Sequence, residues 1–274
     1  MERLSRYPRY QAPIRALAIV QGHPFDRSAF GEMLESFTDL CVSCVDQPAA
    51  QKLLNPEALA DIDTLILHDM PGLDFRVAPA ERPALRPPSL DLQQSLRAVL
   101  NAGIGIVALH HALAGWPQWA EYGQWLGGRF LYGPDARPDS AQPSSGYRKD
   151  VRYRASRCDG MHPVLDGVPE SFELTDELYL CRVDESGMTP LLRADAEFGA
   201  EKFVSAETAA RGETGGADAF QHPPGSNLIA WARQALASRV VYLQPGDASA
   251  TYAHPVYRQL LHNAIRWTAA TPRM

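Results

Sequence analysis

Residues 103–130 read GIGIVALHHALAGWPQWAEYGQWLGGRF, and the first part of this stretch decides which fold we expect. The apolar run from Ile104 to Leu109 is too short for a helix and is rich in β-branched residues. Such a run is typical of a strand buried on both faces, as in a parallel sheet. The run ends in His110 and His111, and open α/β sheets bind their ligands beyond the carboxyl ends of the strands. The two histidines are therefore candidate site residues.

Three tryptophans follow the histidine pair: Trp116, Trp119 and Trp125. A tryptophan ring combines an apolar face with one hydrogen-bond donor, which suits stacking against a sugar ring. Tryptophans near a sheet more often pack in the core, and this alternative stays open for all three. We take Trp116 as a candidate substrate-binding residue. Because adjacent residues of an extended chain face opposite sides, at most one of the two histidines can point into a given pocket.

The composition is that of an ordinary globular protein, with 45% hydrophobic and 21% charged residues in a chain of 274. The net charge is −6 and no basic cluster stands out, so we expect no nucleic-acid partner. No apolar run reaches the length of a membrane span, and the run from Ala16 to Val20 is shorter than a signal-peptide core. We therefore expect a soluble, cytoplasmic protein with a small-molecule partner. Apolar helix faces would also permit a homo-oligomer, although nothing in the sequence specifies one.

Strand and helix patterns alternate along the first half of the chain. Apolar runs predict strands at 15–20, 40–45, 63–68 and 104–109. Helices are expected after the capping residues Asp26 and Ser89. This alternation predicts an α/β fold with a doubly wound, mostly parallel sheet and helices on both faces. Two late strands, at 228–231 and 239–243, predict an antiparallel addition at one edge.

We expect one domain over residues 1–274. Residues 1–13 have the character of an irregular leader, since prolines oppose regular structure there. Long loops rich in proline, glycine or serine are expected at 71–89, 134–146 and 205–226. A short helical piece is expected at 56–60.

Two local features of the sequence argue against particular cofactors. Cys41 and Cys44 form a C-x-x-C inside a predicted strand, where positions three apart face opposite sides, so we expect neither a redox pair nor a metal chelate from them. No glycine-rich phosphate loop is present, and we therefore expect no nucleotide cofactor.

A series of motifs resembles the ThuA-like family, which is named for trehalose utilisation. In chain order the motifs are GIVALHHA, W-x-x-W-x-E-Y with G-G-R-F beyond it, HPVLDGV, F-x-L-x-D-E-L-Y, R-V-V-Y-L-x-P-G-D and N-A-I-R-W. The resemblance extends from Ala16 to about Ala269. It implies a fold similar to class I glutamine amidotransferases, which is a flavodoxin-like sheet flanked by helices. It also implies a role in carbohydrate catabolism.

The chain departs from these relatives at two points. Amidotransferases carry a nucleophilic cysteine at the turn after the central strand, whereas this chain has His110 there and no cysteine nearby. We therefore expect no glutaminase activity. The family pattern near the carboxyl end resembles G-H-D, whereas this chain has Gly246 and Asp247 with no histidine between them. His254 is the candidate replacement for that histidine.

The predicted catalytic residues are His110, Glu177 and Asp176. Histidine is a base matched to neutral pH, and Glu177 can orient the imidazole or act as the acid. Further candidates for substrate binding are His23, Asp69, His111, Trp116, His162, Tyr179 and Arg239. The alternatives are structural: the acidic pair can cap or solvate a strand, and Arg239 can pair with Asp247 alone.

The sequence does not identify which residues would bind a metal ion. Histidines and carboxylates are the ligands of zinc and manganese sites, so a divalent ion is one expectation. However, no chelate spacing such as H-E-x-x-H is present.

The leading functional hypothesis is a hydrolase, lyase or isomerase that acts on trehalose, a related disaccharide or its keto derivative, by acid–base or metal-assisted chemistry. One alternative is a non-catalytic carbohydrate-binding or regulatory protein, because a fold does not determine a function. Another is an amidotransferase-type subunit with a degenerate site that requires a synthase partner.

Overall fold

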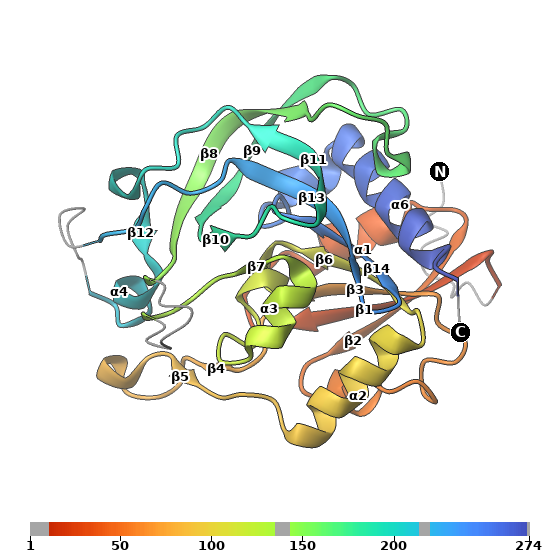
Figure 1. Cartoon of the computed structure of the whole chain (residues 1–274), viewed down its shortest axis with the longest axis horizontal. Coiled ribbons are helices and arrows are strands. Elements are labelled where there is room, and N and C mark those ends of the chain that lie inside the picture. Colours follow the sequence, from red (N-terminus) through yellow and green to blue (C-terminus); the bar gives the residue numbers. More distant parts are fainter. Residues whose placement is uncertain (1–10, 135–142, 214–219, 273–274) are drawn as a thin grey trace.

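One mixed sheet of ten strands runs through the described part of the chain in this computed structural model, which covers residues 11–134, 143–213 and 220–272 (Figure 1). The strand order is β12-β8-β11-β13-β14-β6-β3-β1-β2, and β9 pairs with β8. Five neighbouring strands pair in parallel: β14 (Ser238–Leu243), β6 (Gly105–Leu109), β3 (Thr64–Asp69), β1 (Ile14–Gln21) and β2 (Leu40–Asp46). The predicted strand at 104–109 is confirmed as β6, which is buried along its whole length between β3 and β14.

Alternate residues of the parallel strands face two separate hydrophobic cores. In β1, Leu17 and Ile19 belong to one core, whereas Ala18 and Val20 belong to the other. The first core is covered by α2 (Leu90–Asn101) and α3 (Ala120–Leu126), and the second by α1 (Arg27–Glu35) and α6 (Pro255–Ala269). The prediction of a doubly wound sheet with helices on both faces is confirmed (Figure 1).

The helices begin where the sequence places their caps. The side chain of Asp26 accepts a hydrogen bond from Ala29 N at 3.0 Å, and Ser89 Oγ accepts one from Leu92 N at 3.2 Å. Such caps satisfy backbone donors that have no partner within the helix. Gly103, with φ of 80°, ends the turn between α2 and β6, a conformation that costs glycine little.

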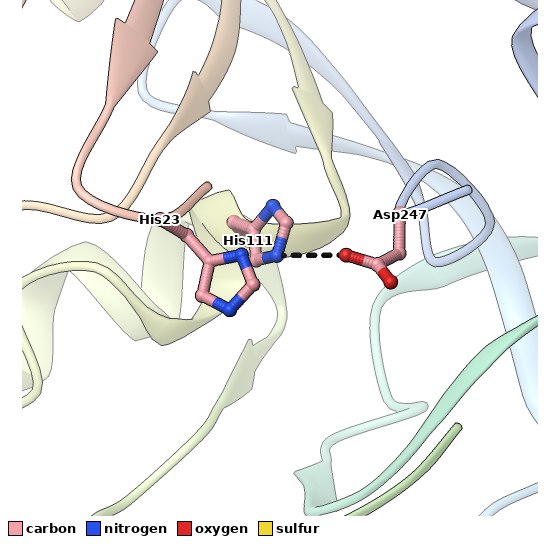
Figure 2. A group of neighbouring side chains, drawn as sticks. All are labelled: His23, His111 and Asp247. Atoms are coloured by element: carbon pink, nitrogen blue, oxygen red, sulfur yellow. Dashed lines mark ion pairs between the residues drawn. The ribbon is translucent and has the colours of Figure 1, made fainter. Parts of the chain in front are cut away.

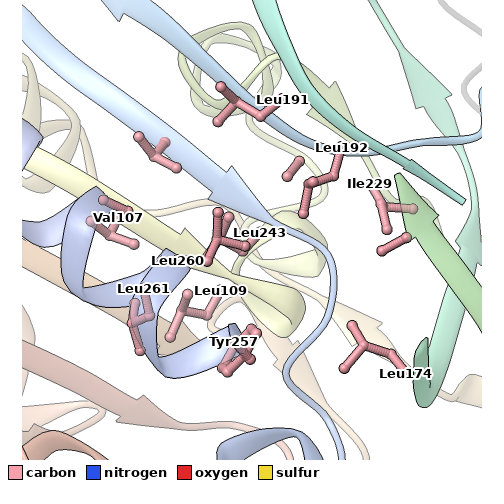
Figure 3. Close-up of a cluster of buried hydrophobic side chains, with 14 of the residues drawn as sticks. Val107, Leu109, Leu174, Leu191, Leu192, Ile229, Leu243, Tyr257, Leu260 and Leu261 are labelled. Carbon is pink, nitrogen blue, oxygen red and sulfur yellow. The ribbon is translucent and has the colours of Figure 1, made fainter. Parts of the chain in front are cut away.

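The prediction that the two late strands form an antiparallel addition at one edge is wrong: β14 pairs in parallel with β6, and both strands lie inside the sheet. The antiparallel part of the sheet begins beyond β14. It contains β13 (Leu228–Ala235), β11 (Met188–Ala194), β8 (Gly146–Arg157), β9 (Ser171–Leu180) and β12 (Val204–Ser205). Figure 3 shows how this extension joins the rest of the molecule: Leu174, Leu192 and Ile229 pack in one cluster with Leu243 and Leu260. The α6 side of the parallel half and the antiparallel extension therefore share a core.

The remaining elements are short, and several lie in segments that were predicted differently. Residues 71–89 are mostly loop, as expected, with only β4 (Leu73–Asp74), β5 (Ala84–Leu85) and a 3-10 turn at Pro79–Glu81. The long loop predicted at 205–226 contains the short helix α4 (Ala206–Ala210), which the sequence did not predict; Ser205 Oγ caps this helix by accepting a hydrogen bond from Thr208 N. The expected helical piece at 56–60 is a turn, and a 3-10 helix lies at Ala49–Lys52 instead.

The other short elements are η4 (His110–Ala114), β7 (Gly128–Arg129), η5 (Pro163–Leu165), β10 (Arg182–Val183), η6 (Ala200–Lys202) and α5 (Ser249–Ala253). Most of the leader at 1–13 and of the loop at 134–146 lies outside the described residues. Within the described ranges, no helix combines the length and apolar character that crossing a bilayer requires.

The close approach of β6 to α6 gives a test of the packing. A Cβ atom at Gly105 would lie 2.3 Å from the carbonyl oxygen of Thr268 on α6, so Gly105→Ala must displace the helix. We expect a loss of about 1–3 kcal/mol in the free energy of unfolding, measured by urea denaturation. Gly31→Ala is the matched control: nothing lies within 4 Å of its added carbon, and alanine is the better helix former by about 0.5–1 kcal/mol. Equal stability of the two variants would contradict this packing.

Candidate active site

A cavity of about 420 Å³ lies beside the carboxyl ends of β1 and β6 and is closed on its other side by the antiparallel extension and α4. This volume is in the range of small-molecule sites. The lining includes His23, His111, Glu177, Lys149, Phe130, Tyr132, Tyr147 and Tyr179. Several aromatic rings with a few ionisable groups among them can hold a ligand that has both apolar and polar faces.

Glu177 is held at the cavity wall by His110. The His110 ring is fully buried, and its Nε2 lies 3.2 Å from Glu177 Oε1. Its Nδ1 forms a hydrogen bond with the backbone carbonyl of Gln244. Because both ring nitrogens face acceptors, both can donate, as in an imidazolium ion. Burial alone would lower the pKa of His110, but the Glu177 carboxylate and two further carboxylates raise it to about 9.

His110 lies behind the cavity wall, not on it. Its φ of 36° turns the chain sharply after β6, and its ring packs on Tyr179 with the ring centroids 4.3 Å apart. Tyr179 and Glu177 line the cavity, whereas the His110 ring contacts the cavity only through them. The residue that the sequence suggested as a base thus occupies the position of a group that orients Glu177.

Asp176 organises the loop that follows β14. Its carboxylate accepts hydrogen bonds from the backbone N–H groups of Glu177, Gly246, Asp247 and Ala248, at 2.8, 2.8, 3.1 and 3.2 Å. The side chain is 1% exposed and does not line the cavity. His68 also holds this loop, through a hydrogen bond of 3.0 Å between its Nε2 and the Gly246 carbonyl oxygen. Asp176 therefore has a structural role in holding residues 246–248.

A second cluster lies at the same end of the sheet (Figure 2). It consists of His23, His111 and Asp247, which follow β1, β6 and β14. The rings of His23 and His111 stack with centroids 4.0 Å apart, and His111 Nε2 lies 3.3 Å from Asp247 Oδ1. Burial lowers the pKa of both histidines. Burial by itself would raise the pKa of Asp247, but the contact with His111 and the charge of His110 hold it well below its usual range.

Sequence reasoning missed Asp247 because it looked for a histidine. Leu243 of β14 pairs with Leu109 of β6, so the residues just beyond these two strand ends are neighbours in space. Asp247 comes from this position, directly after Gly246. His254 lies elsewhere, immediately before α6 with its ring against Phe172. The available signal was the acidic residue after the last parallel strand.

Three of the predicted substrate-binding residues are not brought to the cavity. Trp116 is 7% exposed and packs in the core under α2 and α3. Arg239 lies at the amino end of β14, opposite the end that carries Asp247, and donates to the carbonyl oxygen of Trp267. His162 packs against the Trp267 ring, with centroids 4.7 Å apart. These residue types suit sugar binding, but the sequence patterns did not show where in the fold each side chain lies.

Asp69 lies near the cavity without lining it. It is 4% exposed, and its Oδ2 accepts a hydrogen bond from Gln47 Nε2 at 2.7 Å. Among the described residues, its Oδ1 has no hydrogen-bond partner. Burial raises the pKa of this carboxyl group to about 7.

We compared the chain with known protein families and with curated proteins. The chain matches the family model ThuA, described as trehalose utilisation, over residues 27–268. A search of curated proteins finds no match.

Among solved structures, a ThuA-like protein from Parabacteroides merdae is similar with 17% sequence identity and a TM-score of 0.66, over 96% of this chain and 92% of the other. A ThuA-like protein from Bacteroides uniformis has 16% identity and a TM-score of 0.61, over 96% and 94%. A Thermoplasma acidophilum protein, named as one component of a GMP synthase, has 10% identity and a TM-score of 0.51, over 95% and 96%. These similarities confirm the predicted amidotransferase-like fold.

The burial of Asp69 predicts a pH-dependent stability. Its pKa is about 7 in the folded chain and about 4 in an unfolded one, so folding favours the protonated form, and its contribution to stability is lost as the pH rises through this range. Asp69→Asn removes this loss. We expect the variant to gain about 2–3 kcal/mol relative to the unmodified chain between pH 5 and pH 8, measured by urea unfolding at both values. The exposed Asp61→Asn is the control, and a stability difference for Asp69→Asn that is the same at both pH values would contradict the prediction.

Proposed function

The chain belongs to the ThuA family, described by trehalose utilisation, and from this premise we propose that it is an enzyme that acts on a sugar held in the cavity beside Glu177. The observation that carries the proposal is the carboxylate of Glu177, which lines the cavity and is fixed by the buried His110 ring at 3.2 Å. A fixed carboxylate at the wall of an aromatic cavity suits proton transfer to or from a sugar hydroxyl, a glycosidic oxygen or a carbon beside a carbonyl.

The lining supports a carbohydrate as the ligand class. Phe130, Tyr132, Tyr147 and Tyr179 offer ring faces for the C–H surface of a sugar, and the tyrosines also offer hydroxyl groups. Lys149 and the histidines at the opposite wall can hydrogen-bond with sugar hydroxyls. We propose a disaccharide or its keto derivative as the substrate, and hydrolysis, elimination or isomerisation as the reaction class.

In this proposal, Glu177 is the catalytic acid or base and His110 is a positioning residue. The imidazolium of His110 restrains one carboxylate oxygen and leaves the other for the substrate. Glutaminase chemistry is not proposed, because the position after β6 holds His110 and no cysteine is among the described residues that line the cavity.

Replacement of Glu177 tests the proposal. Glu177→Gln keeps the shape of the side chain but removes its basicity, so we expect kcat/KM to fall by about 10²–10⁴ while sugar binding persists. The assay is turnover of a panel of disaccharides and their keto forms, with binding measured by calorimetry. Glu173→Gln, on the exposed face of the same strand, is the matched control. Sugar binding by the unmodified chain without turnover of any panel member would instead identify a non-catalytic binding protein.

The positioning role of His110 predicts a specific non-additivity. We expect His110→Asn to lower kcat while leaving KM nearly unchanged, since asparagine tolerates positive φ and the cavity lining stays in place. In the Glu177→Gln background the same change should cost little, because the group that His110 orients is already inactive. The measurement is a double-mutant cycle on kcat. Independent, additive losses would show that His110 acts on stability or on the substrate directly.

A further inference from the structure

The cluster of His23, His111 and Asp247 is not used by the acid–base chemistry proposed above, and we propose that it is a binding site for a divalent transition-metal ion. One potential ligand atom from each residue lies within 4.8 Å of the other two. The three residues come from positions 88 and 136 apart in the chain, so only the fold brings them together. Figure 2 shows the two rings and the carboxylate meeting at one place beyond the strand ends.

The first argument is an unmet hydrogen-bonding requirement. His111 is 1% exposed, and among the described residues neither of its ring nitrogens has a hydrogen-bond partner. Its Nε2 lies 3.3 Å from Asp247 Oδ1, which is close enough for an ion pair but is not aligned as a hydrogen bond. Leaving a buried polar atom unpaired costs about 1–3 kcal/mol. An ion held between the two atoms would satisfy both of them.

The second argument is the spacing. Nitrogen and oxygen ligands bind zinc at about 2.1 Å, so two ligand atoms of a tetrahedral ion lie about 3.4 Å apart. The pair of His111 and Asp247 already has this spacing, at 3.3 Å. His23 offers its ligand atom within 4.8 Å of the other two. This residue follows β1 and is only partly buried; its ring stacks on His111, and its Nδ1 forms a hydrogen bond with the Pro24 carbonyl. In the proposed site, this partly exposed ring turns toward the ion.

The third argument is the type of ligand and the surroundings. Two imidazoles and one carboxylate are the ligand set of many catalytic zinc and iron sites, which keep a further position open for water or substrate. His23 and His111 line the same cavity as Glu177, so an open position would face the bound sugar.

An ion at this place would polarise a carbonyl or hydroxyl oxygen of the ligand. Only this role in turnover depends on the proposed function, because binding of the ion depends on the three side chains alone. The two can therefore be tested apart.

The experiment is direct metal analysis followed by titration. The chain is purified without chelators or a metal-binding tag, its metal content is measured by mass spectrometry, and the chelator-treated protein is titrated with Zn²⁺ and with Mn²⁺ by calorimetry. We expect one ion per chain. We expect His23→Gln and Asp247→Asn each to weaken binding at least tenfold, since even residues that only hydrogen-bond to metal ligands contribute about 10- to 100-fold to metal affinity.

Matched variants make the result specific. Cys44→Ser tests the C-x-x-C in β2, and His254→Gln tests the histidine before α6; both should bind the ion like the unmodified chain. Glu177→Gln should also bind the ion, even where it loses turnover, so that failure of the proposed function and failure of the metal site give different results. Because His23 is partly exposed, we expect His23→Gln to fold, and this variant still tests the site if Asp247→Asn does not fold.

Two results would overturn the inference. One is the absence of saturable binding of either ion by the unmodified chain. The other is unchanged affinity in folded His23→Gln and Asp247→Asn variants, or loss of binding in Cys44→Ser, either of which would place the ion elsewhere.

Discussion

The contact between His110 and Glu177 is the interaction on which the arrangement of the site depends. It joins the end of the central parallel strand to the middle of an antiparallel strand, across 67 positions of sequence, and both side chains are almost completely buried. Removing charged groups from water is costly, and a buried pair often adds little net stability. Breaking such a pair is far more costly, at about 3–5 kcal/mol, because one charge stays buried alone. The contact therefore fixes the position of the Glu177 carboxylate at the cavity wall.

Much of the fold follows from short-range patterns in the sequence. The apolar run before His110 is buried because it forms a strand with a neighbour on each side and a helix layer on each face. Alternation in β1 divides its side chains between two cores, and the caps at Asp26 and Ser89 start α1 and α2. Each of these features depends on residues a few positions apart, so the sequence alone predicts them well.

The site was harder to predict, because its members meet only after the sheet has formed. Glu177 and His110 carried a recognisable pattern, but their relative position depends on β9 pairing with β8 far from the central strand. Arg239 lies at the end of β14 away from the cavity, because this strand pairs in parallel with β6, whereas the sequence pattern predicted an antiparallel strand there. Trp116 has the ring that a sugar site needs, yet packing requirements of the core took precedence. Asp247 was overlooked because a familiar motif directed attention to histidine.

Asp176 provides the loop after β14 with an anion: its carboxylate accepts hydrogen bonds from three successive backbone N–H groups of the loop, those of Gly246, Asp247 and Ala248. The path of residues 246–248 is thus dictated from outside the loop, by a side chain on another strand. None of these three hydrogen bonds involves the side chain at position 247. A different side chain at position 247 could therefore alter the chemistry at the cavity while the backbone that presents it keeps its path.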